Sequence, residues 1–117
     1  MSRPSHKELS GKLKAAQGAV SKQSVEIVDP VSLACDALEL GYLIEDELLT
    51  VLSTLLSNTT PENYAGHRPP QKSYEKVIEG LELFAFSIKS DLFNKDIYYK
   101  FSISDNIFFL SSLHEDR

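Results

Sequence analysis

The chain has 117 residues, 42% of them hydrophobic and 25% charged, which is the composition of an ordinary globular protein. That length suits one domain, 1–117, with its own core, and leaves little room for a second. The formal net charge of −5 argues against indiscriminate nucleic-acid binding, because the phosphate backbone favours clustered lysine and arginine.

We expect the protein to stay in the cytoplasm, with no membrane partner. No apolar run approaches the ~18 residues that a bilayer-spanning helix needs. The polar, lysine-rich N-terminus lacks the apolar segment of a secretory signal.

The N-terminal segment predicts a helix followed by a short strand. Ser5 and Glu8 form an S-x-x-E capping box, and apolar residues then recur at helical spacing. We expect this helix to span 5–17 and to end near Gly18, since glycine is common at helix C-termini. The segment 24–28 contains an alternation of valine and isoleucine that predicts a strand.

Two further helices follow. Asp29 supplies an N-cap and Pro30 a first-turn proline for a helix over 30–40 that stops at Gly41. The next helix begins near Glu45, where acidic residues suit the positive end of a helix. The residues that we expect this helix to bury are Leu48, Leu49, Val51, Leu52, Leu55 and Leu56.

Cys35 is the only cysteine, which excludes an internal disulfide and a cysteine-based metal cage. Val31, Ala34 and Leu38 surround it at helical spacing. We therefore expect Cys35 to be a small buried hydrophobe and not a nucleophile.

The second half of the chain predicts a sheet. Prolines, glycine and polar residues over 60–72 predict the longest loop, and 73–78 predicts a helical turn. Strands are expected at 81–89, 97–104 and 107–114, joined as an antiparallel meander. The fold class that follows is α+β, with N-terminal helices packed on a C-terminal antiparallel sheet of three to four strands.

The last hairpin places three chemically useful side chains on one face. A three-residue loop over 104–106 fixes a register in which alternate residues share a face. Tyr98, Lys100 and His114 then lie together on the face that does not pack on the core. The same face also carries Ser102, Phe108 and Leu110. A slip of one residue would exchange the two faces. The predicted pairs are Ile103 with Ile107, Phe101 with Phe109, Tyr99 with Ser111, and Ile97 with Leu113.

Familiar catalytic and cofactor motifs are absent from the sequence. It has no phosphate-binding glycine loop, no H-E-x-x-H and no G-x-S-x-G. His6, His67 and His114 lack metal-ligand spacing. We therefore expect no metal and no cofactor.

Three segments resemble a known family. They are DALELGY over 36–42, IYYKF over 97–101 and LSSLHED over 110–116. Together with the order of the predicted elements, they resemble the MqsR-type toxins of the RelE superfamily, which are messenger-RNA endonucleases. The resemblance covers most of the chain. It implies a RelE-like fold, a metal-independent RNA endonuclease (mRNA interferase) or an inactive relative of one, and a protein antitoxin and RNA as partners.

The resemblance also implies roles for individual residues. It places Tyr98 and Lys100 on the strand where the family keeps an active-site tyrosine and a nearby lysine. It places His114 where the family has a basic residue near the end of the last strand. Cleavage of RNA by its own 2′-hydroxyl needs a base, a proton donor to the leaving oxygen and a cation beside the phosphorane. A phenol, an imidazole and an ammonium can share those roles.

Substrate contacts are expected from His67 and Arg68, on a proline-stiffened loop, and from Arg117 at the C-terminus. Two features depart from the family pattern. The chain is acidic, whereas the family is typically basic, and the loop over 60–72 has no aligned counterpart.

A second interpretation needs no catalysis. Tyr98 is a common strand residue, Lys100 suits a solvent-facing sheet edge, and His114 suits the start of a solvated tail. His67 and Arg68 suit a stiff surface turn. The alternative function is therefore a non-catalytic protein-protein interaction module, which uses its sheet or its acidic helices to bind a partner.

Overall fold

The structure is a computed structural model, and it describes residues 5–116. A four-stranded sheet lies at the centre of the molecule. Its strand order is β1–β4–β3–β2, with β1 (Val25–Ile27), β2 (Phe84–Ser90), β3 (Lys95–Ser104) and β4 (Ile107–Glu115). The last three strands form the predicted antiparallel meander. β1 joins β4 in parallel, so the complete sheet is mixed.

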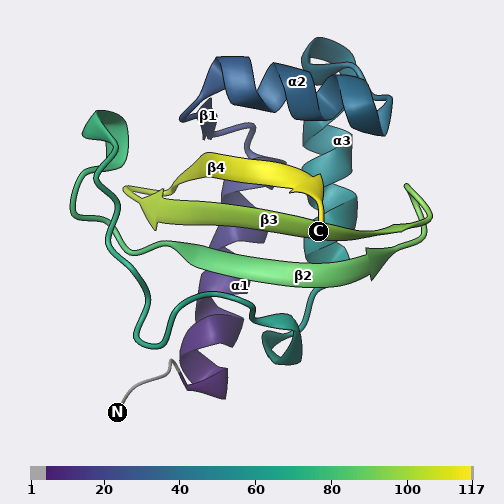
Figure 1. Ribbon diagram of the computed structural model, residues 1–117. Coiled ribbons are helices and arrows are strands. Elements are labelled where there is room, and N and C mark those ends of the chain that lie inside the picture. The colour runs from purple at the N-terminus through teal and green to yellow at the C-terminus, as the bar shows by residue number, and fades with distance from the viewer. Residues whose placement is uncertain (1–4, 117) are drawn as a thin grey trace.

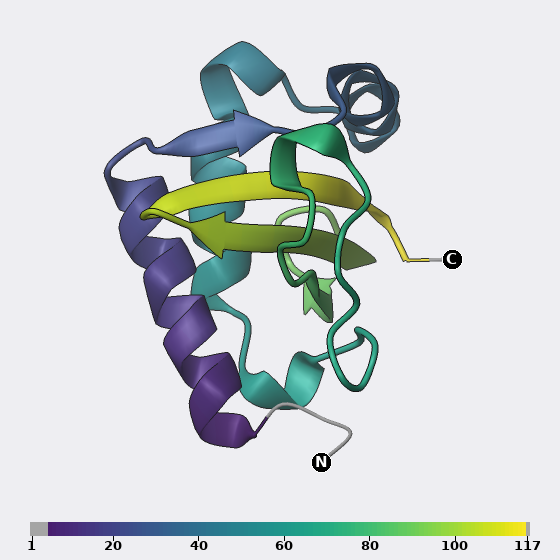
Figure 2. The ribbon, with the colours of Figure 1, turned by 90° about the vertical axis from the view of Figure 1, so that its left-hand side faces the viewer.

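Three helices precede the meander, which confirms the predicted α+β arrangement. α1 (His6–Ser21) and α3 (Ile44–Ser57) cover one face of the sheet, as Figures 1 and 2 show. α2 (Pro30–Leu40) runs along the sheet edge, next to β1 and β4 (Figure 1). None of the helices in the described part of the chain is long and apolar enough to cross a bilayer.

Local sequence signals set several helix ends. The Ser5 hydroxyl accepts a hydrogen bond from the Glu8 backbone N–H at 3.0 Å, and the Asp29 carboxylate accepts one from the Ser32 N–H at 3.1 Å. Gly41 ends α2 with a φ of 84°, a conformation that glycine adopts without a steric penalty. The predicted bounds of α2 are therefore confirmed.

Two other helix predictions were wrong in part. α1 continues past Gly18, although a glycine inside a helix costs about 1 kcal/mol relative to alanine. Ala19 and Val20 are buried on the core side, so burial of this last turn outweighs that cost, and the helix does not end at 17. In α3, the predicted leucines and valine are buried except Leu49, which is 37% exposed.

α2 has two apolar sides, and only one of them faces the core. Leu33 and Ala37 are buried, whereas Val31, Cys35 and Leu38 are exposed. The prediction that Cys35 is buried was therefore wrong, because the stripe that contains it is turned away from the sheet. Helical periodicity detects an apolar stripe without showing which of two stripes packs.

The β3–β4 hairpin has a different register from the predicted one. Its turn has two residues, Asp105 and Asn106, with φ values of 52° and 62°, as in the short turns that suit the twist of paired strands. Phe101 therefore pairs with Leu110 and not with Phe109. Phe108 and Leu110 were predicted on the same face as Tyr98, but both are buried in the core.

A β-bulge then shifts the register of β3 and β4 by one residue towards the end of β4. The register shifts between Lys100 and Phe101, which leaves Ser111 without a partner on β3. As a result, Tyr98 pairs directly with His114. The two residues share a face as predicted, although through a pairing that the predicted register did not contain.

The sheet face towards α1 and α3 carries the core. Tyr99 and Phe101 are fully buried there, with ring centroids 6.1 Å apart. The Tyr99 hydroxyl lies 2.6 Å from the Thr59 hydroxyl, within hydrogen-bond distance. Because side chains alternate along a strand, burial of these two rings directs Tyr98 and Lys100 to the other face. We call this other face, which is turned away from α1 and α3, the outer face.

The long segment between α3 and β2 crosses part of the outer face (Figure 2). It contains two short 3₁₀ helices, η1 (Pro61–Asn63) and η2 (Lys76–Ile78). The second of these falls within the predicted helical turn. Residues 81–83 pair with this segment, for example through the Leu83 N–H, which donates to the Gln71 carbonyl at 2.8 Å. β2 therefore begins three residues later than predicted.

Candidate functional site

Tyr98 and His114 face each other across β3 and β4 on the outer face. Their rings are stacked, with centroids 5.2 Å apart and planes inclined by 24°. Both side chains are half-buried, and cross-strand contact of this kind restricts the rotation of both rings. The structure thus brings together two of the three residues to which we assigned catalytic roles.

Lys100, the third, lies two residues along β3 from Tyr98. It stands opposite Ser112 on β4 and Ala85 on β2, on the same outer face. Its side chain is half-buried and has no ion pair or hydrogen bond with any of residues 5–116. The ammonium group is therefore available to an anion. We call Tyr98, Lys100 and His114 the Tyr98 cluster.

A carboxylate borders the Tyr98 cluster. Ser87 pairs with Tyr98 across β2 and β3, and its hydroxyl donates a hydrogen bond to the Asp116 carboxylate. Burial raises the pKa of the Tyr98 phenol, and the negative charge of Asp116 raises it further. Tyr98 is therefore a neutral phenol at physiological pH, which makes it a proton donor and not a base.

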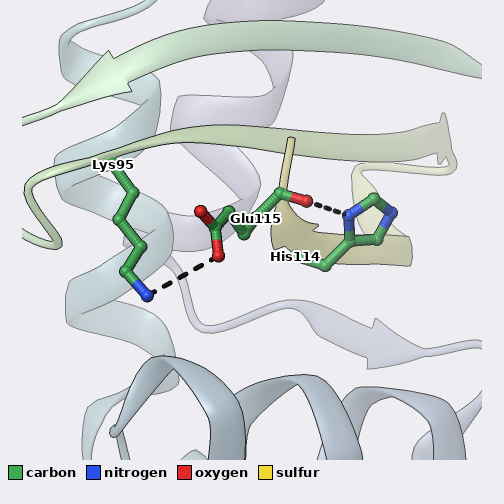
Figure 3. A network of polar contacts seen from close by, with 3 residues as sticks. All are labelled: Lys95, His114 and Glu115. Carbon is green, nitrogen blue, oxygen red and sulfur yellow. Dashed lines mark hydrogen bonds and ion pairs between the residues drawn. The ribbon is translucent and has the colours of Figure 1, made fainter. Parts of the chain in front are cut away.

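His114 has one ring nitrogen engaged and one remaining. Its Nδ1 lies 2.8 Å from the backbone oxygen of Glu115, as Figure 3 shows. In the neutral tautomer that donates from Nδ1, the Nε2 atom presents a lone pair that can accept a proton. The Glu115 carboxylate turns instead to the Lys95 ammonium at 3.6 Å, an exposed pair of the kind that contributes little to stability.

His67 and Arg68 both contact Tyr64. The Tyr64 hydroxyl donates to the His67 carbonyl, and the Arg68 guanidinium lies 5.5 Å from the centroid of the Tyr64 ring. No hydrogen bond, ion pair or ring contact within the described residues joins either of them to the Tyr98 cluster. Arg117, the third predicted substrate contact, lies outside the described residues.

Sequence reasoning missed a second feature, a groove between α2 and the start of α3. It has a volume of about 270 Å³, and its lining includes Leu38, Tyr42, Leu43, Glu45 and Asp46. We call it the α2–α3 groove. None of its lining residues belongs to the Tyr98 cluster. The available signal was the second apolar stripe of α2, which we assigned to the core.

Tyr42 is the most unusual residue of this groove. It is 7% exposed, and its buried hydroxyl has no hydrogen-bond partner among residues 5–116. Burial raises the pKa of Tyr42 to about 12, with a further contribution from the charge of Asp36. Its ring packs against Phe93, with centroids 5.9 Å apart, so the apolar part of the side chain is well accommodated.

No group of three or more His, Cys, Asp or Glu residues in the described part of the chain is placed to hold a metal ion. No protein-family model matches the sequence, and no curated protein matches it at a significant level of similarity.

Proposed function

We propose that the protein is an RNA endonuclease of the toxin–antitoxin type, or an inactive relative of one, and that the Tyr98 cluster is its catalytic site. The observation that carries this proposal is the stacked pair of Tyr98 and His114, with the Lys100 ammonium on the same face. The cluster combines a neutral phenol, an imidazole with one free nitrogen and a cation. These three groups can supply the base, the proton donor and the cation that metal-independent cleavage of RNA needs.

Each group has a definite part in this reaction. The Nε2 atom of His114 takes the proton from a ribose 2′-hydroxyl as that oxygen attacks the adjacent phosphorus. The Tyr98 hydroxyl gives its proton to the departing 5′-oxygen, and Lys100 stabilises the negative charge of the phosphorane. The products are a 2′,3′-cyclic phosphate on one fragment and a free 5′-hydroxyl on the other.

The proposal includes a protein antitoxin as partner and the cytoplasm as location. Messenger RNA is found in the cytoplasm, and a toxin that cleaves it in the cell that makes it is expected to have an inhibitor. The resemblance of the segments 36–42, 97–101 and 110–116 to MqsR-type toxins supports both points.

A second candidate is a non-catalytic protein interaction module. The observation that favours it is the negative charge beside the Tyr98 cluster, where Glu115 and Asp116 follow His114 and Asp116 acts on Tyr98. These carboxylates oppose the approach of a polyanion such as RNA. On this alternative, Tyr98 and His114 stack only to stabilise the hairpin.

The two candidates are separated by incubating the purified protein with a defined messenger RNA in EDTA and following its fragments. The endonuclease predicts cleavage, and induced expression in cells should stop growth while intact messenger RNA disappears. A chain that leaves RNA intact in both assays would contradict endonuclease activity and favour the interaction module.

A further inference from the structure

One side of α2 is apolar and has no described element packed on it. Val31, Ala34, Cys35 and Leu38 follow one another at positions i, i+3, i+4 and i+7, which places them on a single stripe. Val31 is 76% and Leu38 is 84% exposed. The opposite stripe, which contains the buried Leu33 and Ala37, is the one that packs on the sheet. A helix that is apolar on two sides is typical of one covered on both.

The exposed stripe continues into the α2–α3 groove. Leu38 belongs to both, and Leu43, on the other wall, is 64% exposed. At the same place, the buried Tyr42 hydroxyl has no hydrogen-bond partner among residues 5–116. Large exposed leucines beside a concave apolar surface are characteristic of a site that another molecule covers.

The charge around this surface selects among possible occupants. Residues 29–49 contain six acidic residues and no lysine or arginine, although the whole chain has a net charge of only −5. Glu45 and Asp46 line the groove itself and are exposed. An acidic rim repels an anionic membrane surface, and it also repels the same surface of a second copy. It attracts a basic partner.

The shape of the surface selects the secondary structure of that partner. The walls of the groove are side chains of two helices and their connection. The groove therefore contains no strand edge to which an extended peptide could add as a further strand. An occupant whose backbone bonds are satisfied internally fits such walls, and that describes a helix. The lysine-bearing helix α1 of a second copy does not fit, because Leu9, Leu13 and Ala16 on its apolar side are already buried.

We propose that the α2–α3 groove, together with the exposed stripe of α2, binds a basic amphipathic helix of a partner protein. Apolar side chains one turn apart on that helix cover Leu38 and Leu43. Lysine or arginine side chains along its flanks face Glu45 and Asp46. This binding surface shares no residue with the Tyr98 cluster, so the inference stands whether or not the protein cleaves RNA.

The test uses a synthetic peptide of about 18 residues, or five helical turns, with leucines at i, i+3, i+4 and i+7 and lysines on both flanks. A matched peptide has glutamate in place of each lysine, and a third has serine in place of each leucine. Binding to the full chain is followed by fluorescence anisotropy. The only thiol of the protein, Cys35, lies on the stripe, and its protection from a thiol reagent gives an independent readout.

The lysine peptide should bind the full chain and slow modification of Cys35, while the other two peptides should not. The double variant Leu38→Ser/Leu43→Ser should bind the lysine peptide at least about tenfold more weakly, because both side chains are central to the surface. Glu45→Gln/Asp46→Asn should weaken binding about threefold to tenfold and reduce its salt dependence. Val77→Ser, which removes an exposed apolar side chain elsewhere (59% exposed), should bind like the unmodified protein.

Three results would overturn the proposal. One is that no peptide binds or protects Cys35, and another is that the glutamate peptide binds as tightly as the lysine peptide. The third is self-association of the protein in sedimentation equilibrium that Leu38→Ser abolishes, because a second copy would then be the occupant. Circular dichroism of each variant shows whether a loss of binding reflects the surface or the fold. None of these results depends on RNA cleavage.

Discussion

The Tyr98 cluster and the α2–α3 groove differ in which of their side chains have partners within the protein. In the cluster, polar groups contact one another: the His114 ring stacks on Tyr98, and its Nδ1 faces a backbone oxygen. In the groove, large apolar side chains face water, and the buried Tyr42 hydroxyl has no partner among residues 5–116. The first arrangement suits chemistry on a polar group, and the second suits the binding of an apolar surface.

The difference follows from where each region lies in the fold. The cluster lies on β3 and β4, the two central strands of the sheet. Because Tyr99 and Phe101 are buried on the inner face, their neighbours Tyr98 and Lys100 lie on the outer face. α2 lies at the edge of the sheet, where a single layer is available to pack against it. An apolar helix in that position keeps one side uncovered. Substitutions should therefore affect the two regions independently.

The largest expected effect is on the cluster. Tyr98→Phe and His114→Gln should each lower RNA cleavage by a factor on the order of 100 or more, the scale for losing a general acid or base. Initial rates on one defined RNA measure this. The matched controls are Tyr74→Phe, at a tyrosine that is 89% exposed, and His6→Gln, at an exposed histidine in α1. Equal losses in the controls, or none in the cluster variants, would remove the cluster from consideration.

Lys100→Gln should have a smaller effect. We expect a fall in kcat on the order of tenfold with KM less changed, because the ammonium stabilises charge that develops mainly in the transition state. Steady-state kinetics separate the two constants. Lys89→Gln, at an exposed position on β2, controls for the loss of one positive charge. A rise in KM with an unchanged kcat would instead make Lys100 a simple RNA-binding residue.

Tyr42→Phe should increase stability. It removes a buried hydroxyl that lacks a partner, which should raise the free energy of unfolding by about 1 kcal/mol in urea titrations. The pKa of Tyr42 is about 12 in the folded protein, above the value of about 10 for an unfolded chain. Between these values the unfolded state has lost the proton and the folded state has kept it, so stability falls as pH rises. That fall should be smaller in Tyr42→Phe than in the unmodified protein.

The result that would contradict this account is a loss of stability in Tyr42→Phe, or the same alkaline response in both proteins. The hydroxyl would then have a partner in solution. Tyr74→Phe serves as the control, because an exposed phenol should affect neither quantity.

The smallest effect is expected at Cys35. Because it lies on the exposed stripe, Cys35→Ser should change the free energy of unfolding by less than about 0.5 kcal/mol. The native thiol should react with a thiol reagent nearly as fast as it does in the urea-unfolded protein. Slow modification of the native protein, with fast modification after unfolding, would show that this side of α2 is covered.

Sequence patterns were sufficient where one rule decided the structure. Asp29, Pro30 and Gly41 set both ends of α2, and alternation within β2, β3 and β4 gave the meander. Patterns were insufficient where two solutions had similar local signals. The hairpin turn was assigned three residues instead of two, because Asn106 and Asp105 both tolerate positive φ.

The candidate site was predicted in part for similar reasons. Tyr98 and His114 share a face, although the predicted register was wrong and the bulge at Ser111 was not foreseen. A bulge depends on the packing of both strands, which local sequence does not reveal. The exposed stripe of α2 was placed in the core, because only the tertiary arrangement shows how many layers surround a helix.

The most direct test of the proposed function is the chemistry of the RNA ends. A defined RNA is incubated in EDTA with the unmodified protein and with the double variant Tyr98→Phe/His114→Gln, and the fragments are analysed by mass spectrometry. We predict 2′,3′-cyclic phosphate and 5′-hydroxyl ends from the unmodified protein and none from the double variant. Intact RNA with the unmodified protein, or the same fragments from both proteins, would contradict the assignment of the Tyr98 cluster as a catalytic site.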